Sequence, residues 1–334
     1  VQNHYNNDLL PQQRCIDNLH CINFAYDNDN LLIQAGSLSL TRSSDNGLIT
    51  GTAINTINPI STTTTYNGFG EQQSSNAVHN GSSLIQTGYN HDKLGRITQK
   101  TETIAGISNA YEYAYDASGR LVTITKDNIV IETYVYDSNN NRTHINAVEI
   151  ASYDDQDRLL TYNGNSYTYT ANGELNSKTN SGITTNYVYD TLGNLKQVTL
   201  PGDIIIDYVI DGQNRRIGKK VNGQLTQGFL YKDQLNPIAE LDGNGNIVTR
   251  FVYAEKGSVP SYLIKTDPVT QIETTYRVIS DHLGSPRLIV NTDDGSIAQR
   301  IDYDTWGNII QDTNPGFQPF GFAGGIYDQH TQLV

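Results

Sequence analysis

Methionine is absent from these 334 residues, tryptophan occurs once, and cysteine occurs twice. Because an initiator methionine and a secretory leader are both lacking, we expect the chain to be a fragment or a processed segment, with any targeting signal outside it. No apolar run approaches the roughly 18 residues that a membrane-spanning helix needs, and no long run of like charges forms a tail. These absences exclude a transmembrane segment and a charged tail within this sequence.

Cysteine is too scarce for a disulfide scaffold, which needs several bridges. Cys15 and Cys21 are either incidental thiols or a short-loop disulfide, and the sequence leaves both open. A zinc site would need four ligands, and the nearest additional candidates are His4 and His20. The pair therefore says little about the cellular compartment.

Charge is sparse and mostly negative. The formal net charge is -13, and charged residues make up only 17% of the chain. Such a balance repels a phosphate backbone, so we expect no nucleic-acid partner. Apolar residues reach 37%, below the roughly 45–50% of compact globular domains.

Tyrosine is the large side chain that this sequence has in excess, with 22 copies against 7 phenylalanines. Asparagine, threonine, glycine and aspartate are also abundant, and these residues favour strands and turns over helices. No segment shows sustained helical periodicity with a cap. The composition predicts an all-β protein, with strand above half of the residues and very little helix.

An internal repeat runs through the middle of the chain, and its length suits two strands and two turns. It reads YEYAYDASGRL at Tyr111–Leu121, and further copies are YVYDSNNNR from Tyr134, YDDQDRLL from Tyr153, YTYTANGEL from Tyr167, YVYDTLGNL from Tyr187 and YVIDGQNRRI from Tyr208. In the first copy the tyrosines alternate with other residues, which places them on one sheet face. Asp116 then opens a turn and Gly119 supplies a positive φ.

The tyrosines of successive copies should occupy equivalent places on successive hairpins. We expect their side chains to point to one common face and to pack across strands. The residues concerned are Tyr113, Tyr115, Tyr134, Tyr136, Tyr187 and Tyr189.

Repeat regularity divides the chain into three parts. Residues 1–87 hold degenerate copies, residues 88–227 hold regular copies, and residues 228–334 form a less regular segment. No low-complexity linker separates them.

The last part resembles the core-associated region of bacterial rearrangement-hotspot (Rhs) and YD-repeat proteins. The resemblance is carried by YKDQLNPIAELDGNGNIVTRFVY from Tyr231, YRVISDHLGSPRLIV from Tyr276, IDYDTWGNII from Ile301 and PGFQPFGFAGGIYDQHTQLV from Pro315. With the upstream copies it covers two thirds or more of the chain. The family includes the C components of ABC toxin complexes, type VI Rhs effectors and, more distantly, teneurins.

The resemblance implies tandem β-hairpins in a long curved ribbon that forms part of a spiral hollow shell. It implies a secreted or cell-surface bacterial protein that encloses its own C-terminal toxin domain as cargo, with secretion-apparatus or toxin-complex components as further partners. The alternative is a cell-surface adhesion or carbohydrate-binding YD-repeat protein.

In the family, a further core segment ends in an Asp-Pro-x-Gly self-cleavage motif and is followed by the toxin. This sequence stops at Leu333–Val334, so no catalytic role can be carried over and we expect no enzyme. We assign no catalytic residue, no cofactor-binding residue and no metal ligand. We expect the segment to leave strand edges open and to self-associate through them.

Four motifs that resemble functional sites are interpreted as structural. The motif with Asp281, His282 and Arg287 lacks a nucleophile or metal partner, so we expect a tight turn. The stretch Asp242–Asn246 lacks the glycine and glutamate of a calcium loop, which predicts a hairpin turn. The bond Asp267–Pro268 lacks the glycine of the cleavage motif and also predicts a turn. The glycines of Pro319–Gly325 should allow rings and backbone to approach closely.

Overall fold

Antiparallel strands make up almost all of the regular structure in the computed structural model, which describes residues 1–54 and 59–334. More than half of the described residues lie in strands, and the helical part of the described chain is one 3₁₀ turn, η1 (Phe322–Gly324). The prediction of an all-β ribbon of hairpins is confirmed.

The strands form two sheets in which each strand neighbours the next one in the chain. The 15-stranded sheet contains β1 (Gln2–Tyr5), β2 (Pro11–Ile16), β3 (His20–Tyr26), β4 (Leu32–Ala35), β5 (Leu38–Arg42), β6 (Ile49–Ile54), β7 (Ile60–Tyr66), β8 (Gln72–His79), β9 (Ser82–His91), β10 (Ile97–Ile104), β11 (Ile107–Tyr115), β12 (Leu121–Lys126), β13 (Ile129–Tyr136), β14 (Arg142–Ile145) and β15 (Val148–Glu149).

The second sheet has 16 strands in the same sequential order. It contains β16 (Ala151–Tyr153), β17 (Leu159–Tyr162), β18 (Asn165–Tyr169), β19 (Leu175–Asn180), β20 (Ile183–Tyr189), β21 (Leu195–Leu200), β22 (Ile204–Ile210), β23 (Arg216–Val221), β24 (Gln224–Tyr231), β25 (Pro237–Asp242), β26 (Ile247–Val252), β27 (Tyr262–Thr266), β28 (Glu273–Ser280), β29 (Pro286–Asn291), β30 (Ile297–Tyr303) and β31 (Ile309–Asp312). Sequential antiparallel pairing needs only short turns, which fits the short repeat.

The described chain divides into two compact units. Unit 1 comprises Val1–Leu84, Asp211–Lys219 and Gln224–Val334, and unit 2 comprises Ile85–Ile210 and Lys220–Gly223. This division follows spatial packing, whereas the three parts predicted from the sequence follow repeat regularity, so those boundaries stay a prediction.

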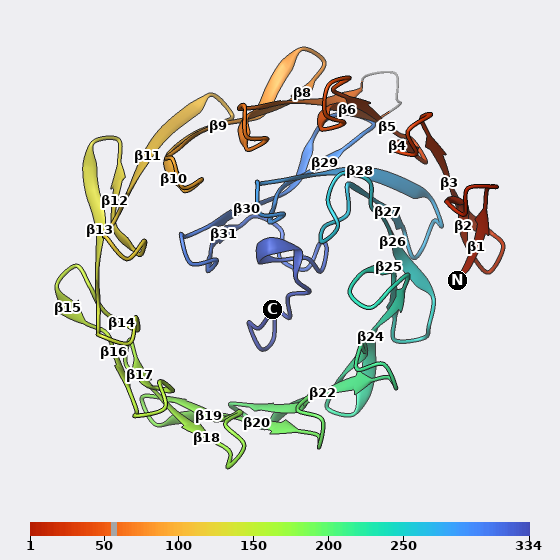
Figure 1. Cartoon of the computed structure of the whole chain (residues 1–334). Coiled ribbons are helices and arrows are strands. Elements are labelled where there is room, and N and C mark those ends of the chain that lie inside the picture. Colours follow the sequence, from red (N-terminus) through yellow and green to blue (C-terminus); the bar gives the residue numbers. More distant parts are fainter. Residues whose placement is uncertain (55–58) are drawn as a thin grey trace. The chain divides into compact units, whose positions relative to one another are not determined.

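Unit 2 is a single ribbon of hairpins that bends along its course from β9 to β22 (Figure 1). Its hairpins turn alternately at turns led mostly by aspartate, with Thr170 in that place between β18 and β19, and at tight turns such as Asp127–Asn128, where both residues have positive φ. Aspartate and asparagine tolerate this conformation better than most residues. A register shift typical of a β-bulge precedes several of the aspartate-led turns, as between Ala114 and Tyr115.

Unit 1 has two layers, because strands β2–β7 lie alongside β25–β29 (Figure 1). The main apolar cluster lies in the second layer, where Phe251, Leu263, Val278 and Ile289 are at most 3% exposed. Phe320 from the C-terminal segment meets Phe251 edge-on, with ring centroids 4.9 Å apart. The core of unit 1 is therefore closed partly by residues that follow the last strand.

Candidate functional site

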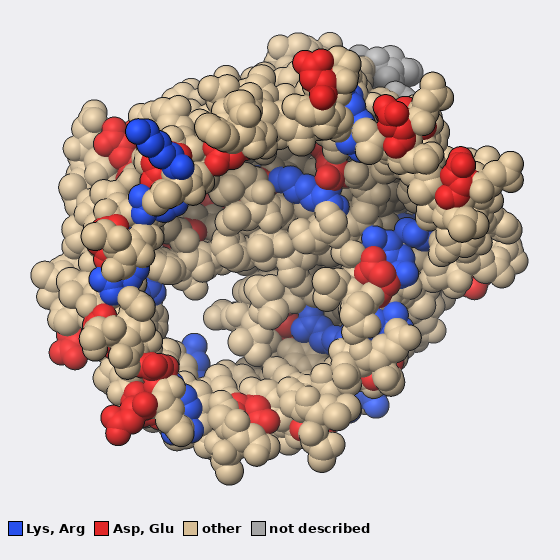
Figure 2. Space-filling view, in the orientation of Figure 1, with Lys and Arg blue, Asp and Glu red and all other residues tan. Residues whose placement is uncertain are grey.

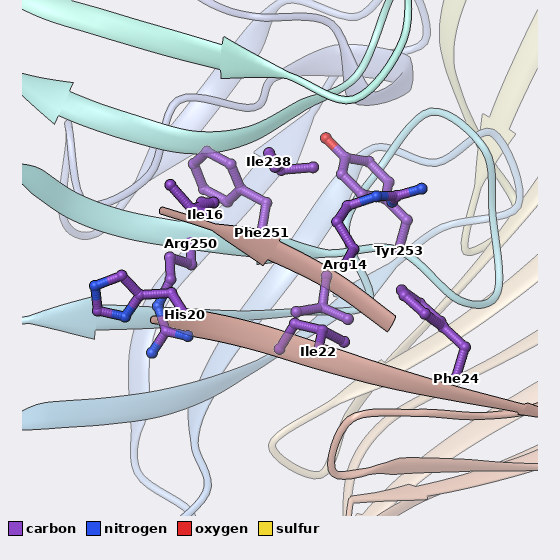
Figure 3. Close-up of a pocket in the computed structure, with 10 residues that line it drawn as sticks. Arg14, Ile16, His20, Ile22, Phe24, Ile238, Arg250, Phe251 and Tyr253 are labelled. Carbon is purple, nitrogen blue, oxygen red and sulfur yellow. The ribbon is translucent and has the colours of Figure 1, made fainter. Parts of the chain in front are cut away.

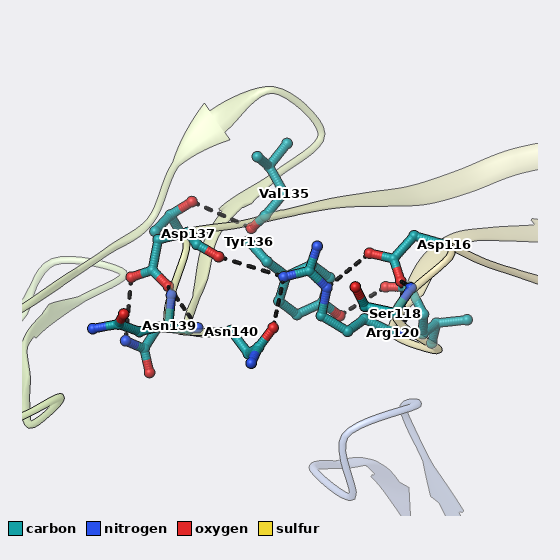
Figure 4. Close-up of polar contacts among 11 residues, drawn as sticks. Asp116, Ser118, Arg120, Val135, Tyr136, Asp137, Asn139 and Asn140 are labelled. Atoms are coloured by element: carbon teal, nitrogen blue, oxygen red, sulfur yellow. Dashed lines mark hydrogen bonds and ion pairs between the residues drawn. The ribbon is translucent and has the colours of Figure 1, made fainter.

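An aspartate side chain organises many of the hairpin turns. Between β11 and β12, Asp116 Oδ1 accepts backbone hydrogen bonds from Ser118 and Arg120, at 2.9 Å each (Figure 4). Asp137 makes the equivalent two bonds in the following turn, also at 2.9 Å. The same pair of bonds recurs at Asp92, Asp154, Asp190, Asp211, Asp242 and Asp304. Each turn is thus closed by contacts among a few consecutive residues.

The second carboxylate oxygen of the aspartate is bound by the residue that restarts the strand. Arg120 Nε donates to Asp116 Oδ2 at 2.7 Å. Arginine takes this role in three further turns, at Arg96, Arg158 and Arg215. Asparagine replaces it elsewhere, as where the Asn246 amide donates to Asp242 Oδ2 at 3.0 Å. Both residue types can donate to a carboxylate, which explains why the repeat tolerates either.

The same arginine also reaches the next hairpin. The Arg120 guanidinium lies 4.8 Å from the centroid of the Tyr136 ring and donates to Asn140 Oδ1 at 2.9 Å. Equivalent stacks place Arg96 over Tyr115, Arg158 over Tyr169 and Arg215 over Tyr231. A cation over an aromatic face contributes about 0.5–1 kcal/mol at partly exposed positions. One hairpin's aspartate is thereby coupled through arginine to the next hairpin's tyrosine.

The tyrosine hydroxyl makes a further bond to the neighbouring strand. Tyr136 donates to the carbonyl oxygen of Leu121 at 2.7 Å, and Tyr115 donates to that of Ile97 at 2.8 Å. The same kind of bond is made by Tyr26, Tyr66, Tyr153, Tyr169, Tyr231 and Tyr253. We call the repeated set of aspartate, strand-restarting residue and tyrosine the turn interlock.

Hydrogen bonds in the turn interlock favour the ionised aspartate. The backbone N–H of Arg120, followed by its side chain, holds the pKa of Asp116 below its ordinary value. For Asp92, the side-chain hydrogen bond from Arg96 is the largest cause of a lowered pKa. Burial acts in the opposite direction on the tyrosines and raises the pKa of Tyr136 and Tyr115. At neutral pH the interlock therefore consists of carboxylate, guanidinium and un-ionised phenol.

The six predicted tyrosines share one face of their strands. Tyr134 and Tyr187 are 4% and 6% exposed, whereas Val135 and Val188, which follow them, are each 50% exposed. Ala114 is likewise exposed between two partly buried tyrosines. The tyrosines occupy equivalent positions beside the bulge, as at Tyr115, Tyr136 and Tyr189. The prediction of a common tyrosine face is confirmed within each of these strands.

The two layers of unit 1 meet at an apolar pocket that we call the seam pocket (Figure 3). Ile16 and Ile22 line it from β2 and β3, and Ile238 and Phe251 line it from β25 and β26. Arginines lie among these apolar groups, and burial lowers the pKa of Arg14. Arg250 is 8% exposed and pairs with Glu273 at 2.5 Å. The seam pocket is a packing contact between strands that are distant in sequence.

A disulfide joins Cys15 to Cys21 beside the seam pocket. The two cysteines are direct partners on β2 and β3, so the bridge crosses the hairpin. This settles the alternative that the sequence leaves open. A bridged hairpin keeps Ile16 in place against Ile238 and Ala239.

Buried polar contacts also hold the two layers together. Tyr262 is 1% exposed, and its hydroxyl donates to the carbonyl oxygen of Ala35 at 3.2 Å and accepts from the backbone N–H of Ser37 at 3.3 Å. Arg277 is also 1% exposed and donates to Thr52 Oγ1 at 3.0 Å. Because buried polar groups are costly without partners, these bonds fix one docking register.

Comparison with known families gives a match over nearly the whole sequence. The teneurin YD-shell family model matches residues 4–334. The chain belongs to the teneurin YD-shell family.

Curated relatives of this YD-shell chain include animal and bacterial proteins. Teneurin-1 of Gallus gallus is 31% identical and Teneurin-4 of Homo sapiens is 28% identical, each over 257 residues, which is 73% of this chain. The tRNA3(Ser)-specific nuclease WapA of Bacillus spizizenii is 27% identical over 66% of this chain. The aligned region spans 9% of the length of each relative.

Solved structures share the YD-shell fold. The Photorhabdus luminescens Tc holotoxin pore with a mutant TccC3 aligns with a TM-score of 0.54 at 15% identity, covering 92% of this chain and 19% of that chain. A crystal structure of TcdB2-TccC3-TEV gives the same values. At this level of identity the likeness establishes the fold alone. Together with the family match, it confirms the resemblance to Rhs and YD-repeat proteins.

The motifs that the sequence interprets as structural take structural places in the YD-shell. Asp281 Oδ1 accepts from the backbone N–H of Leu283 and of Ser285, at 2.9 Å each. His282 is exposed on that turn, whereas Arg287 is 5% exposed and pairs with Asp302 at 2.7 Å. The three residues of the motif are therefore not directed to one site.

The two other predicted turns are also present, and the glycines near the C-terminus pack tightly. Asp242 joins β25 to β26, and Asp267 accepts from Val269 and Thr270 between β27 and β28. A Cβ at Gly324 would lie 2.5 Å from the carbonyl oxygen of Ser258. The predicted close approach of backbone at Pro319–Gly325 is confirmed.

No group of His, Cys, Asp and Glu side chains in residues 1–54 and 59–334 is placed to hold a metal ion. Likewise, no helix in that part of the chain is long and apolar enough to cross a membrane. The visible face carries charged residues in small, scattered groups separated by uncharged surface (Figure 2).

Sequence reasoning missed the contacts between the layers of unit 1. Tyr262 and Arg277 lie in segments without a marked repeat, and their partners Ala35 and Thr52 lie in the degenerate N-terminal copies. The arginine within the apolar strand at Arg277 indicates a buried polar contact, but the sequence does not show which residue the arginine contacts.

Proposed function

We propose that this YD-shell chain is a wall segment of a secreted bacterial polymorphic toxin, which encloses a C-terminal toxin domain and helps to deliver it. The observation that carries the proposal is the turn interlock, because it builds a continuous wall from contacts between successive hairpins. Such arrays gain stability roughly as a sum of neighbour contacts, so a wall can be long without a large dry core.

Two further observations support this function. The fold resembles the Tc toxin structures, and the bacterial relative WapA is a nuclease. The disulfide Cys15–Cys21 fits an oxidising environment outside the cytoplasm. Under this proposal the cargo is the protein's own toxin domain, and secretion-apparatus or toxin-complex components are further partners.

Limited proteolysis of the full-length protein tests enclosure. The double variant Arg120→Ala with Arg158→Ala removes two links of the interlock, and Lys220→Ala removes an exposed lysine as the control. We expect the region after the wall to resist protease in the native protein and in the control, and to be cleaved faster in the double variant. Equal and rapid cleavage of that region in all three proteins would contradict enclosure.

A second candidate function is cell-surface adhesion or carbohydrate binding. The animal teneurins favour it, because they match over 73% of this chain. The region that follows the wall in the full-length protein separates the two candidates. A variable toxin domain after a cleavage motif supports enclosure, and a membrane anchor or cell-wall domain supports adhesion.

A further inference from the structure

A second cleft in unit 1 differs from the seam pocket in its polar lining. We call it the hydroxyl cleft, and it has a volume of about 630 Å³ when its open mouth is included. Its two walls are β7 and β8 on one side and the segment 255–261 with the end of β28 on the other.

The first wall presents side-chain hydroxyls that have no protein partner. Thr64 and Ser75 face each other as direct partners on β7 and β8, yet neither side chain is hydrogen-bonded within the described residues. The adjacent pair, Thr65 and Ser74, lies outside the cleft lining, and its hydroxyls bond each other at 2.6 Å. Gln72, on the same wall, also has no side-chain partner among the described residues. This wall therefore offers both donors and acceptors.

The second wall contains charges that are already engaged within the protein. Arg277 pairs with Glu255 at 2.6 Å, and Lys256 donates to the carbonyl oxygen of Asp281. The Nε of Arg277 is buried and has no hydrogen-bond partner among the described residues. The Ser280 hydroxyl on this wall is also without a partner there. The charge of Arg277 is thus paired with Glu255, while Lys256 is held by a backbone carbonyl on this wall, and a neutral polar ligand would find several open hydrogen-bonding groups.

Apolar surface completes the lining. Val259, Pro260 and Ile279 contribute C–H surface opposite the hydroxyls. Hydroxyl and amide groups can each donate and accept, so they suit a ligand that presents hydroxyls next to C–H faces. A peptide strand would need a free backbone edge for main-chain pairing, but β7 lies between β6 and β8, and β28 lies between β27 and β29.

We propose that the hydroxyl cleft binds a neutral saccharide of one or two rings. The Thr64–Ser75 pair and Ser280 hydrogen-bond the sugar hydroxyls, and the apolar side chains contact a ring face. This site goes beyond cargo enclosure and does not depend on it, because the lining belongs to the wall itself.

Saturation-transfer NMR on the 334-residue chain tests the site, with D-glucose, N-acetylglucosamine and maltose as probes. We expect transfer to at least one of these sugars, with weak affinity. The variant Thr64→Val with Ser75→Ala should weaken binding about tenfold, as the loss of two neutral hydrogen bonds predicts. The matched control is Thr65→Val with Ser74→Ala, which alters the adjacent pair on the same strands and should leave binding unchanged.

Ser280→Ala provides an independent variant on the other wall, and it should also weaken binding. Circular dichroism confirms that each variant keeps the native strand content before binding is compared. The proposal is overturned if none of the three sugars shows transfer. It is also overturned if the control pair weakens binding as much as the Thr64 and Ser75 pair, or if a neutral Gly-Ser peptide binds where the sugars do not.

Discussion

Arg120 joins two hairpins, because its guanidinium lies 4.8 Å from the centroid of the Tyr136 ring while its Nε is 2.7 Å from Asp116 Oδ2. Asp116 belongs to the turn before β12, and Tyr136 is the last residue of β13. A single side chain thus contacts two successive repeats and restrains their relative positions. Such links join successive hairpins of unit 2, which also buries apolar side chains such as Ile124 and Val198.

Arg120→Met tests this link while keeping an unbranched side chain of similar length. We expect a loss of about 0.5–1 kcal/mol from the cation–π contact, with a further effect from the lost hydrogen bonds. Hydrogen exchange should show faster exchange in β12, β13 and β14 than in the native chain. Lys220→Ala serves as the control, and equal protection of these strands in Arg120→Met and the control would show that the link is not stabilising.

The carboxylates of the interlock predict how stability depends on pH. Hydrogen bonds hold the pKa of Asp92, Asp116, Asp154 and Asp211 below the ordinary value. Because the folded pKa lies below the unfolded value of about 3.9, the ionised groups stabilise the fold above that value, and this stabilisation is lost as the pH falls through the folded pKa. We expect urea midpoints to hold steady down to about pH 5 and to fall below about pH 4.

Asp116→Asn provides the matched variant for the pH experiment. Asn67 occupies the equivalent position before β8 and accepts backbone bonds from Phe69 at 2.9 Å and Glu71 at 3.1 Å. The turn should therefore form with asparagine, and the variant should show a smaller loss of stability in acid. If the variant loses as much stability in acid as the native chain does, Asp116 does not contribute to the acid-dependent loss of stability.

Tyr262→Phe tests the docking of the two layers in unit 1. Removing the hydroxyl leaves the buried carbonyl oxygen of Ala35 without this partner, and it also removes the acceptor of the Ser37 N–H. Leaving a buried polar group unsatisfied costs about 1–3 kcal/mol. Thermal unfolding should shift to lower temperature, and hydrogen exchange should rise in β4 and β5. Tyr169→Phe, which removes a hydroxyl within unit 2, should leave exchange in β4 and β5 unchanged.

Reduction of the Cys15–Cys21 bridge should loosen the N-terminal hairpin. The chain-entropy model gives about 2 kcal/mol for a loop this short. We expect reducing agent to increase protease cleavage within β1–β3 and to leave unit 2 unaffected. Cys15→Ala with Cys21→Ala should behave as the reduced chain does, and resistance equal to that of the oxidised chain would show that packing at Ile16 and Ile238 is sufficient.

The ends of the sheets predict self-association of the isolated chain. β1 and β15 are the outer strands of one sheet, and β16 and β31 are those of the other. Unpaired strand edges tend to pair with other chains. Size-exclusion chromatography with light scattering should show mass increasing with concentration, whereas the full-length protein stays discrete. An isolated chain that remains monomeric over a wide concentration range would show that these edges are protected.

The repeating unit of this protein follows from the order of its residues alone. The alternation of Tyr113 and Tyr115, the turn at Asp116 and the positive φ of Gly119 are all predictable, because strand alternation and turn chemistry depend on neighbouring residues. The all-β class and the common tyrosine face are predictable for the same reason. The stretch Tyr231–Tyr253 and the later motifs also indicate the family, because a resemblance of this kind depends on residue order and needs no knowledge of distant contacts.

Which distant segments meet is a property of the folded chain. Tyr262 and Ala35 are 227 residues apart, and no local preference specifies that pairing. The partner of Arg277 and the hydroxyl cleft also depend on how the N-terminal strands lie against β25–β29 in unit 1. The bridge between Cys15 and Cys21 requires their direct pairing across β2 and β3. Contacts of this kind arise from the docking of whole layers, whose register is set by summed packing and buried hydrogen bonds and by no single residue pattern.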